Sequence, residues 1–155
     1  MICTAFWHGL RASEVVGRKG LLGKQINNGH IYVQRLKGSM FTKQPLISHI
    51  DPLLDERAGL EKLALEVGLN NRMFNIGRKM LWVIMQEAGK KAGIDKDLCH
   101  FHILKHSTAM NARKAGMEIE DLKQYMGHKS GSSTMEYLKV DDSEASKAFS
   151  AAMGV

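Results

Sequence analysis

The sequence has few of the features that define membrane proteins, disulfide scaffolds or zinc modules. Its 155 residues include two cysteines, Cys3 and Cys99, which lie far apart without CxxC spacing. That pattern argues against both a disulfide framework and a zinc ribbon. No apolar run approaches the roughly 20 residues that a membrane span needs, and residues 1–10 lack a secretory signal. A location in the cytoplasm, away from membranes, is therefore expected.

Acidic residues are scarce in the first third of the chain. Residues 1–50 hold seven lysines and arginines but one acid, Glu14, whereas the rest of the chain holds 15 basic and 15 acidic residues. Because clustered cations attract polyanions, nucleic acid is the leading candidate partner. A generally basic surface is the alternative, since charge alone identifies no partner. The side chains expected to contact DNA are Arg18, Lys19, Lys24, Arg35 and Lys43.

Turn residues predict a small antiparallel sheet within this basic third. Asn28-Gly29 is typical of a two-residue hairpin turn, and Lys37-Gly38-Ser39 marks a second turn. Pro45 disfavours a central position for the last strand because proline cannot donate to the ladder. Strands are expected at residues 21–26, 31–36 and 41–47.

Helical periodicity dominates after residue 50. The expected helices span residues 51–67, 71–92, 102–115, 118–126, 132–139 and 143–152. Gly116 and Gly127 are expected to end two of them. An apolar stripe in the second helix is expected in the core and comprises Met73, Ile76, Met80, Val83, Ile84 and Glu87. The predicted fold is a single, mainly α-helical domain over residues 1–155 with a small three-stranded antiparallel β-sheet.

Three short stretches carry a recognisable pattern of polar residues: HGLRASE at residues 8–14, FHILKHS at 101–107, and MGH at 126–128 followed by Tyr137. Together they resemble the catalytic motifs of the tyrosine recombinases, or phage integrase family: GLRxSE, a hairpin lysine, HxLRH, LGH and a tyrosine. The separations Arg11–Lys37, His102–His128 and His128–Tyr137 are 26, 26 and 9 residues. This resemblance covers about residues 5–140 and implies a mostly helical catalytic domain with a three-stranded sheet.

The resemblance implies site-specific DNA recombination through a 3′-phosphotyrosyl intermediate. Tyr137 would supply the attacking oxygen. A phenol is a poor nucleophile near its free pKa of about 10, so it needs deprotonation and cationic neighbours. Because the phosphotyrosyl bond preserves the energy of the phosphodiester, the reaction requires no cofactor and no metal. Tyr32 and Tyr125 fit packing roles better.

Arg11 matches the first phosphate-binding arginine of the family, and its guanidinium offers donors in a fixed fork to two phosphate oxygens. The alternative role is a surface ion pair with Glu14. Under the family interpretation, Glu14 orients the site without reacting. Lys37 on the hairpin would protonate the leaving 5′ oxygen; Lys43 and Arg35 are its substitutes.

Two histidines match family positions that handle protons and phosphate oxygens. His102 is expected to act as the base or hydrogen-bond partner for the phosphate and nucleophile. His128 is expected to donate a hydrogen bond to a non-bridging oxygen, a kind of help that is typically worth 10² to 10⁴ in rate. His106 also matches the pattern but is expected to be a buried hydrogen-bonding residue. Structural roles are expected for His8, His30, His49 and His100.

Lys105 is the main local departure, because it stands where the family pattern has its second arginine. Lysine keeps the positive charge but cannot fix a phosphate oxygen through two parallel hydrogen bonds. Catalysis is therefore expected to be weaker. The other departure is length: the chain is expected to lack the amino-terminal DNA-binding domain of most family members and the first helix of the catalytic domain. Weaker phosphate contact and looser site choice should follow.

Three functions remain open. The leading one is the catalytic domain of a recombinase or integrase encoded by a mobile element, acting on double-stranded DNA. A catalytically weak or inactive DNA-binding remnant is the alternative, and relaxation of the type IB topoisomerase kind is less favoured. Residues 143–152 present a small apolar face that would pack equally well on its own chain or on a neighbour in a tetramer on DNA. A monomer is expected in isolation.

Overall fold

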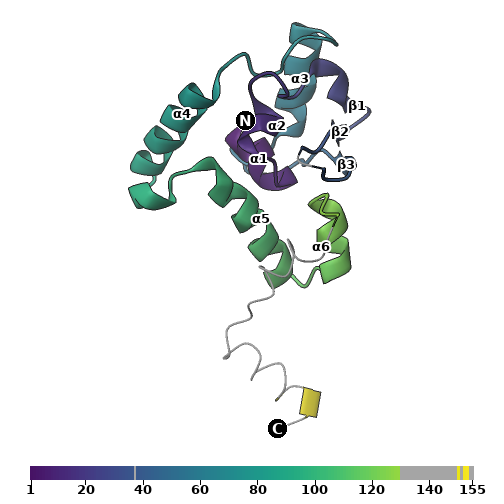
Figure 1. The fold of residues 1–155 in the computed structure, drawn as a ribbon, viewed down its shortest axis with the longest axis vertical. Coiled ribbons are helices and arrows are strands. Elements are labelled where there is room, and N and C mark those ends of the chain that lie inside the picture. The colour runs from purple at the N-terminus through teal and green to yellow at the C-terminus, as the bar shows by residue number, and fades with distance from the viewer. Residues whose placement is uncertain (37, 130–149, 151, 154–155) are drawn as a thin grey trace.

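The structure is a computed structural model that describes residues 1–36, 38–129, 150 and 152–153. Figure 1 shows the sheet and the N-terminal helices on one side, helix α4 on the other, and α5 between them. The predicted fold class is confirmed: the described part is mainly helical, with one three-stranded antiparallel sheet. No helix within the described ranges is long and apolar enough to cross a membrane.

The sheet consists of β1 (Ile26–Asn27), β2 (His30–Val33) and β3 (Thr42–Pro45), in that order. Asn28 and Gly29 both have positive φ, 50° and 69°, as a type I′ turn requires. The predicted hairpin is therefore confirmed, and proline lies on an edge strand as expected. The strand predicted at 21–26 is mostly wrong, because the short 3₁₀ helix η1 (Gly23–Gln25) replaces it.

One face of the sheet is buried and the other faces outward. Ile31 pairs with Gln44 and Val33 with Thr42, and all four side chains are buried. Tyr32 pairs with Lys43 on the opposite face. Side chains alternate along a strand, so this register sets which residues of the segment contact the helices.

Helix α1 (Ile2–His8) and the single turn α2 (Ala12–Val15) precede the sheet, and α3 (Arg57–Val67) follows it. The prediction that a helix begins at residue 51 is wrong. Asp51 and Asp55 accept hydrogen bonds from the backbone N–H groups two residues on, at Leu53 and Arg57. Such side-chain contacts favour turns over helix, so α3 begins six residues later than expected.

Helix α4 (Arg78–Lys91) also begins later than residue 71. Backbone hydrogen bonds from Gly23 to Asn71 and from Met73 to Leu21 hold the preceding segment in a loop. The predicted apolar stripe is therefore out of phase: Met80 is 51% exposed. Met73 is buried, but it belongs to the loop. The face of α4 that enters the core comprises Leu81, Met85 and Gly89.

The main hydrophobic core joins α1, the buried face of the sheet, α3 and α4. A smaller cluster joins helices α5 (Phe101–Lys114) and α6 (Ile119–Tyr125) through Ala109, Leu122 and Met126. The predictions for residues 102–115 and 118–126 are confirmed to within one residue at each end. A short 3₁₀ helix, η2 (Lys96–Leu98), lies between α4 and α5. The helices predicted at 132–139 and 143–152 lie outside the described residues, save for residues 150 and 152.

Candidate active site

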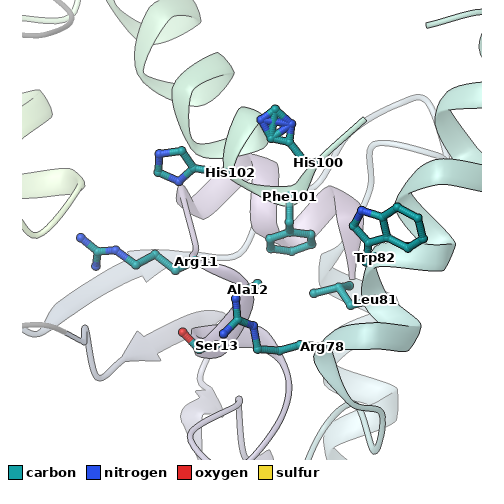
Figure 2. A pocket seen from close by; sticks show the side chains of 9 residues that line it. All are labelled: Arg11, Ala12, Ser13, Arg78, Leu81, Trp82, His100, Phe101 and His102. Atoms are coloured by element: carbon teal, nitrogen blue, oxygen red, sulfur yellow. The ribbon is translucent and has the colours of Figure 1, made fainter. Parts of the chain in front are cut away.

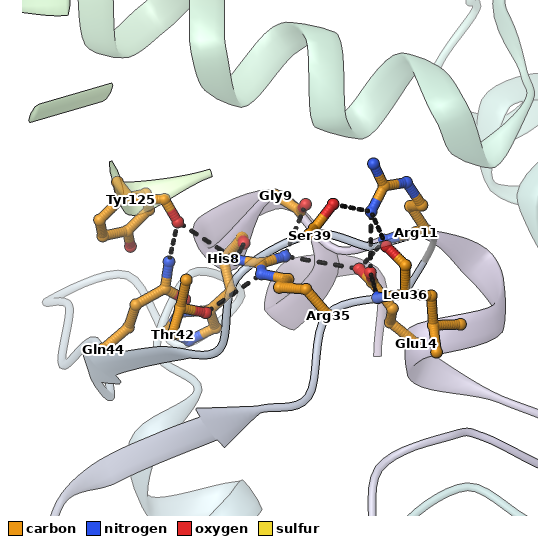
Figure 3. A network of polar contacts seen from close by, with 10 residues as sticks. All are labelled: His8, Gly9, Arg11, Glu14, Arg35, Leu36, Ser39, Thr42, Gln44 and Tyr125. Carbon is orange, nitrogen blue, oxygen red and sulfur yellow. Dashed lines mark hydrogen bonds and ion pairs between the residues drawn. The ribbon is translucent and has the colours of Figure 1, made fainter. Parts of the chain in front are cut away.

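Arg11 lies immediately before α2, where a buried carboxylate holds it by two contacts. The Arg11 backbone N–H donates to Glu14 Oε2 at 2.8 Å, and Nη1 donates to Glu14 Oε1 at 3.0 Å. Nη1 also reaches the Leu36 carbonyl and Ser39 Oγ, both at 3.4 Å. No partner within the described ranges engages Nε or Nη2, so one edge of the guanidinium is left for a ligand (Figure 3).

Glu14 is the acceptor at the centre of this arrangement. Its carboxylate receives the Leu36 backbone N–H at 2.9 Å and pairs with Arg35 at 3.4 Å. Burial alone raises the pKa of Glu14, but the hydrogen bonds from Arg11 and Leu36 and the two arginine charges outweigh it and lower the pKa. Glu14 therefore stays ionised and orients Arg11.

Arg35 does not lie on a DNA-facing surface, so its predicted role as a DNA contact or as a substitute for Lys37 is wrong. The side chain is 3% exposed. Its guanidinium donates to the carbonyls of His8 at 2.8 Å, Gly9 at 3.0 Å and Tyr125 at 3.2 Å, and to Thr42 Oγ1 at 3.1 Å. Arg35 therefore ties the end of α1, the sheet and the end of α6 together (Figure 3).

Two glycines allow the first and last motifs to approach each other. Gly9 has φ 56°, and a Cβ there would lie 2.7 Å from Met126 Sδ. Gly127 has φ 69°, and a Cβ there would lie 2.8 Å from both Arg35 Cγ and the Met40 carbonyl oxygen. Any larger residue would separate the two motifs, because positive φ and close approach both favour glycine.

Lys105 is buried within α5, with a side chain 2% exposed. Its Nζ has no hydrogen-bond partner among the described residues. Burial, followed by the charges of Arg11 and Arg35, lowers the pKa of Lys105 to about 7. The structure therefore places an unpaired amine near Arg11, where an anion would stabilise its charged form.

His128 lies three residues after the end of α6, and His102 lies at the start of α5. Burial, then Lys105 and the two arginines, lower the pKa of His128 to about 4. Burial, then His106, Lys105 and Arg11, lower the pKa of His102. These shared influences show that the four family positions in the described residues converge on one region.

His106 is only partly buried, so the prediction of a buried residue is wrong in that respect. Its ring meets that of His102 edge-on, with 4.4 Å between centroids. His102 and His106 are four residues apart on α5, so their side chains lie on the same face of the helix and meet. His8 is fully buried between Gln44 Oε1 at 2.9 Å and Glu56 Oε1 at 2.6 Å, which agrees with the structural role expected for it.

The other four predicted DNA contacts, Arg18, Lys19, Lys24 and Lys43, are exposed. Arg18, Lys19 and Lys24 line a groove of about 670 Å³ on the side of Tyr32. Lys43 lies 5.7 Å from the centroid of the Tyr32 ring. Three basic side chains of the groove and Lys43 of β3 are therefore exposed near Tyr32.

A separate cavity of about 390 Å³ opens beside Arg11 (Figure 2). Arg78 and Trp82 of α4 line it together with His102. Neither α4 residue was predicted to belong to the site. Their i, i+4 spacing at the start of a helix is the signal that could have identified them, had the start of α4 been placed correctly.

Two of the six predicted catalytic residues, Lys37 and Tyr137, lie outside the described residues. Tyr125, which is described, donates its hydroxyl to the Trp7 carbonyl at 3.0 Å. Burial, followed by the charge of Glu56, raises the pKa of Tyr125 to about 12. It is therefore unsuited to nucleophilic attack. The described part of the chain contains no cluster of three or more metal-binding side chains.

The sequence profile of the phage integrase family matches residues 1–144. The chain belongs to the phage integrase family. Among curated relatives, it is 26% identical to the type 1 fimbriae regulatory protein FimE of Escherichia coli K12 over 149 residues, which are 88% of this chain and 71% of FimE. It is 29% identical to tyrosine recombinase XerA of Pyrococcus furiosus over 136 residues, which are 85% of this chain and 46% of XerA.

Solved structures support the integrase fold. The XerH recombinase bound to its difH substrate matches 96% of this chain and 44% of XerH, with a TM-score of 0.69 at 18% identity. A crystal structure of XerA recombinase matches 94% of this chain and 54% of XerA, with a TM-score of 0.62 at 20% identity. The integrase-family chain therefore spans about half the length of the solved recombinases it matches.

Proposed function

We propose that this chain cleaves and rejoins DNA strands in site-specific recombination, through a 3′-phosphotyrosyl intermediate at Tyr137. The convergence of Arg11, Lys105, His102 and His128 is the observation that carries the proposal. These residues come from three separate elements, yet Arg11 and Lys105 both affect the pKa values of the two histidines. Such a concentration of cationic and hydrogen-bonding groups fits a phosphate whose negative charge grows in the transition state.

Each group has a defined task in this reaction. The free edge of Arg11 and the ammonium of Lys105 bind non-bridging oxygens, and neutral His128 donates an N–H to one of them. The Tyr137 oxygen forms a bond to phosphorus while its proton passes to His102. The bond from phosphorus to the 5′ oxygen breaks, and Lys37 protonates that oxygen. Rejoining reverses both proton transfers, so the reaction consumes no cofactor.

Double-stranded DNA is the proposed partner. The exposed Arg18, Lys19 and Lys24 would contact backbone phosphates outside the catalytic pocket. A lambda integrase dimer bound to a core site and XerH bound to difH share this fold. We further propose a monomer in isolation and assembly on DNA into a tetramer, with residues 143–152 as the contact between subunits.

The setting of the reaction follows from the same function. A recombinase that acts on chromosomal DNA would work in the cytoplasm, on the nucleoid of a prokaryote, and would be encoded by a mobile element.

A catalytically weak DNA-binding remnant is the second candidate, and Lys105 is the observation that favours it. An amine with a pKa near 7 is only partly charged at neutral pH. It also lacks the second donor that an arginine would offer to the same phosphate. Weak cleavage is therefore compatible with an intact fold.

A nicked suicide duplex tests the proposal, because loss of the short fragment that carries the new 5′ hydroxyl prevents rejoining and traps the covalent intermediate. On a denaturing gel we expect a protein–DNA adduct that Tyr137→Phe abolishes. Tyr125→Phe is the matched control and should retain the adduct, since it removes a hydroxyl that is already bonded elsewhere. Salt-sensitive DNA binding without any adduct would instead establish the remnant.

Lys105→Arg provides a second arm of the test. Higher cleavage by this variant would show that the lysine limits catalysis. Lower cleavage would show that the pocket is shaped for an ammonium group. Either outcome supports the proposal that the chain is an enzyme. Absence of cleavage by both the native chain and Lys105→Arg would contradict it.

A further inference from the structure

The cavity beside Arg11 extends from two residues of the proposed reaction, Arg11 and His102, to Arg78 and Trp82 of α4, which have no role in the reaction described above. Arg11 and His102 line one side of it, Arg78 and Trp82 of α4 line the other, and the Phe101 ring lies between them (Figure 2). Its volume of about 390 Å³ is at the small end of the range for ligand pockets, about 300–1,000 Å³. A site of this kind suits a small group that is anionic at one end and apolar at the other.

Arg78 is the unpaired charge of this cavity. It is the first residue of α4 and exposed, and no carboxylate among the described residues pairs with it. By contrast, the arginine at the corresponding first position of α3, Arg57, pairs with Glu61 one turn later at 3.3 Å. Within the described ranges, the Arg78 guanidinium therefore keeps its donors available for a ligand.

Trp82 lies one helical turn after Arg78, so the two side chains share a face of α4. Its indole is 53% exposed, whereas the adjacent Leu81 is 1% exposed and fixes the rotation of the helix against the core. A half-exposed indole on a rigid helix is a surface on which a sugar or base ring can pack.

We propose that this cavity binds the backbone phosphate and deoxyribose next to the scissile phosphate of duplex DNA. Arg78 contacts that phosphate, and the Trp82 indole packs against the sugar. The inference rests on the proposed function, because a scissile phosphate at Arg11 places the next sugar–phosphate unit beside it. Arg11 lines both sites, so the DNA strand continues from one to the other without leaving the protein surface.

Tryptophan fluorescence tests the packing directly, since Trp7 and Trp82 are the two tryptophans. The test uses the full chain carrying Tyr137→Phe and Trp7→Phe, a 30-base-pair duplex, and acrylamide as quencher. Saturating duplex should lower the Stern–Volmer constant of Trp82 at least about twofold, because packing excludes the quencher. The Tyr137→Phe, Trp82→Phe protein, which reports on Trp7, should not change. If Trp7→Phe fails to fold, the difference between the Tyr137→Phe protein and its Trp82→Phe variant gives the same signal.

Arg78→Gln tests the phosphate contact, with Lys91→Gln at the far end of the same helix as the matched control. One lost charge-assisted contact should weaken duplex binding about tenfold and reduce the slope of log K against log[salt] by about one. Lys91→Gln should leave both values unchanged. Equal effects of the two substitutions would overturn the proposal.

Two further results separate the inference from the proposed function. Duplex binding that leaves Trp82 fully quenchable refutes the subsite while recombination stands. Protection of Trp82 without a Tyr137-dependent adduct supports the subsite and refutes the strand-cleavage function. Equal protection by inorganic phosphate alone would also overturn the inference, because it would show a site for a free anion.

Discussion

The charge of Lys105 should make DNA binding depend on pH near neutrality. Burial and the neighbouring Arg11 and Arg35 lower its pKa to about 7. The protonated fraction of the free protein therefore falls from about nine tenths at pH 6 to about one tenth at pH 8. Since binding a phosphate requires the ammonium form, affinity for duplex DNA should fall about tenfold over this interval.

The same calculation predicts where the effect should be absent. A phosphate charge about 4 Å away at an effective dielectric constant of about 20 stabilises the ammonium by about 4 kcal/mol, or about three pKa units. Lys105 should therefore be fully charged in the complex. The rate of cleavage within the bound complex should not decline between pH 6 and pH 8 on account of Lys105.

The assay is fluorescence anisotropy of a labelled duplex at constant ionic strength, with Tyr137→Phe protein to prevent cleavage. The control adds Lys105→Arg, because an arginine stays charged throughout this range. His128, with a pKa of about 4, stays neutral across the same interval. The reasoning would be refuted if Kd weakened equally in the lysine and arginine proteins.

Three further predictions concern stability, each measured by urea unfolding. Arg35→Met should lower the free energy of unfolding by about 3 kcal/mol, because it removes the donor to the His8 and Gly9 carbonyls and one of the cations beside Glu14; a loss below 1 kcal/mol would contradict the role assigned to Arg35. Gly127→Ala should lower the free energy of unfolding by at least about 1 kcal/mol, because alanine disfavours positive φ and its Cβ would contact Arg35. Gly93 has a similar φ but no atom within 4 Å of an added Cβ, so Gly93→Ala measures the cost of the backbone strain alone. The folded-state pKa of Lys105 lies below its unfolded value of 10.5, so the unfolded chain binds more protons between pH 7 and pH 9 and stability rises with pH there. Relative to Lys105→Met, the native chain should gain about 2 kcal/mol over that interval, and parallel pH curves would disprove the buried charge.

The residues of the candidate site were predictable because they belong to short sequence motifs that occur in a fixed order along the chain. Gly116 and Gly127 were expected to end helices, and the positive φ of both is confirmed. The hairpin was predictable for the same reason, since Asn28-Gly29 satisfies a specific turn geometry. In such cases neighbouring residues alone determine the backbone conformation.

Features that depend on distant contacts were not predictable in the same way. Arg35 looked like a surface cation near a turn, although Ile31, Val33 and Arg35 alternate along one strand direction and place its side chain on the buried face. The late start of α4 follows from hydrogen bonds between the loop and Leu21 and Gly23. Nothing in residues 71–77 alone indicates those partners, so the phase of the apolar stripe was misplaced.

Peptide mapping of the trapped adduct tests the central claim most directly. Tyr32, Tyr125 and Tyr137 fall on three different tryptic peptides, spanning residues 25–35, 124–129 and 130–139. Mass spectrometry of the digested adduct should find the nucleotide remnant on 130–139, attached through a 3′ phosphate to the tyrosine. Attachment to either other peptide, or a 5′-phosphate linkage, would contradict the proposal that Arg11, Lys105, His102 and His128 present a DNA phosphate to Tyr137.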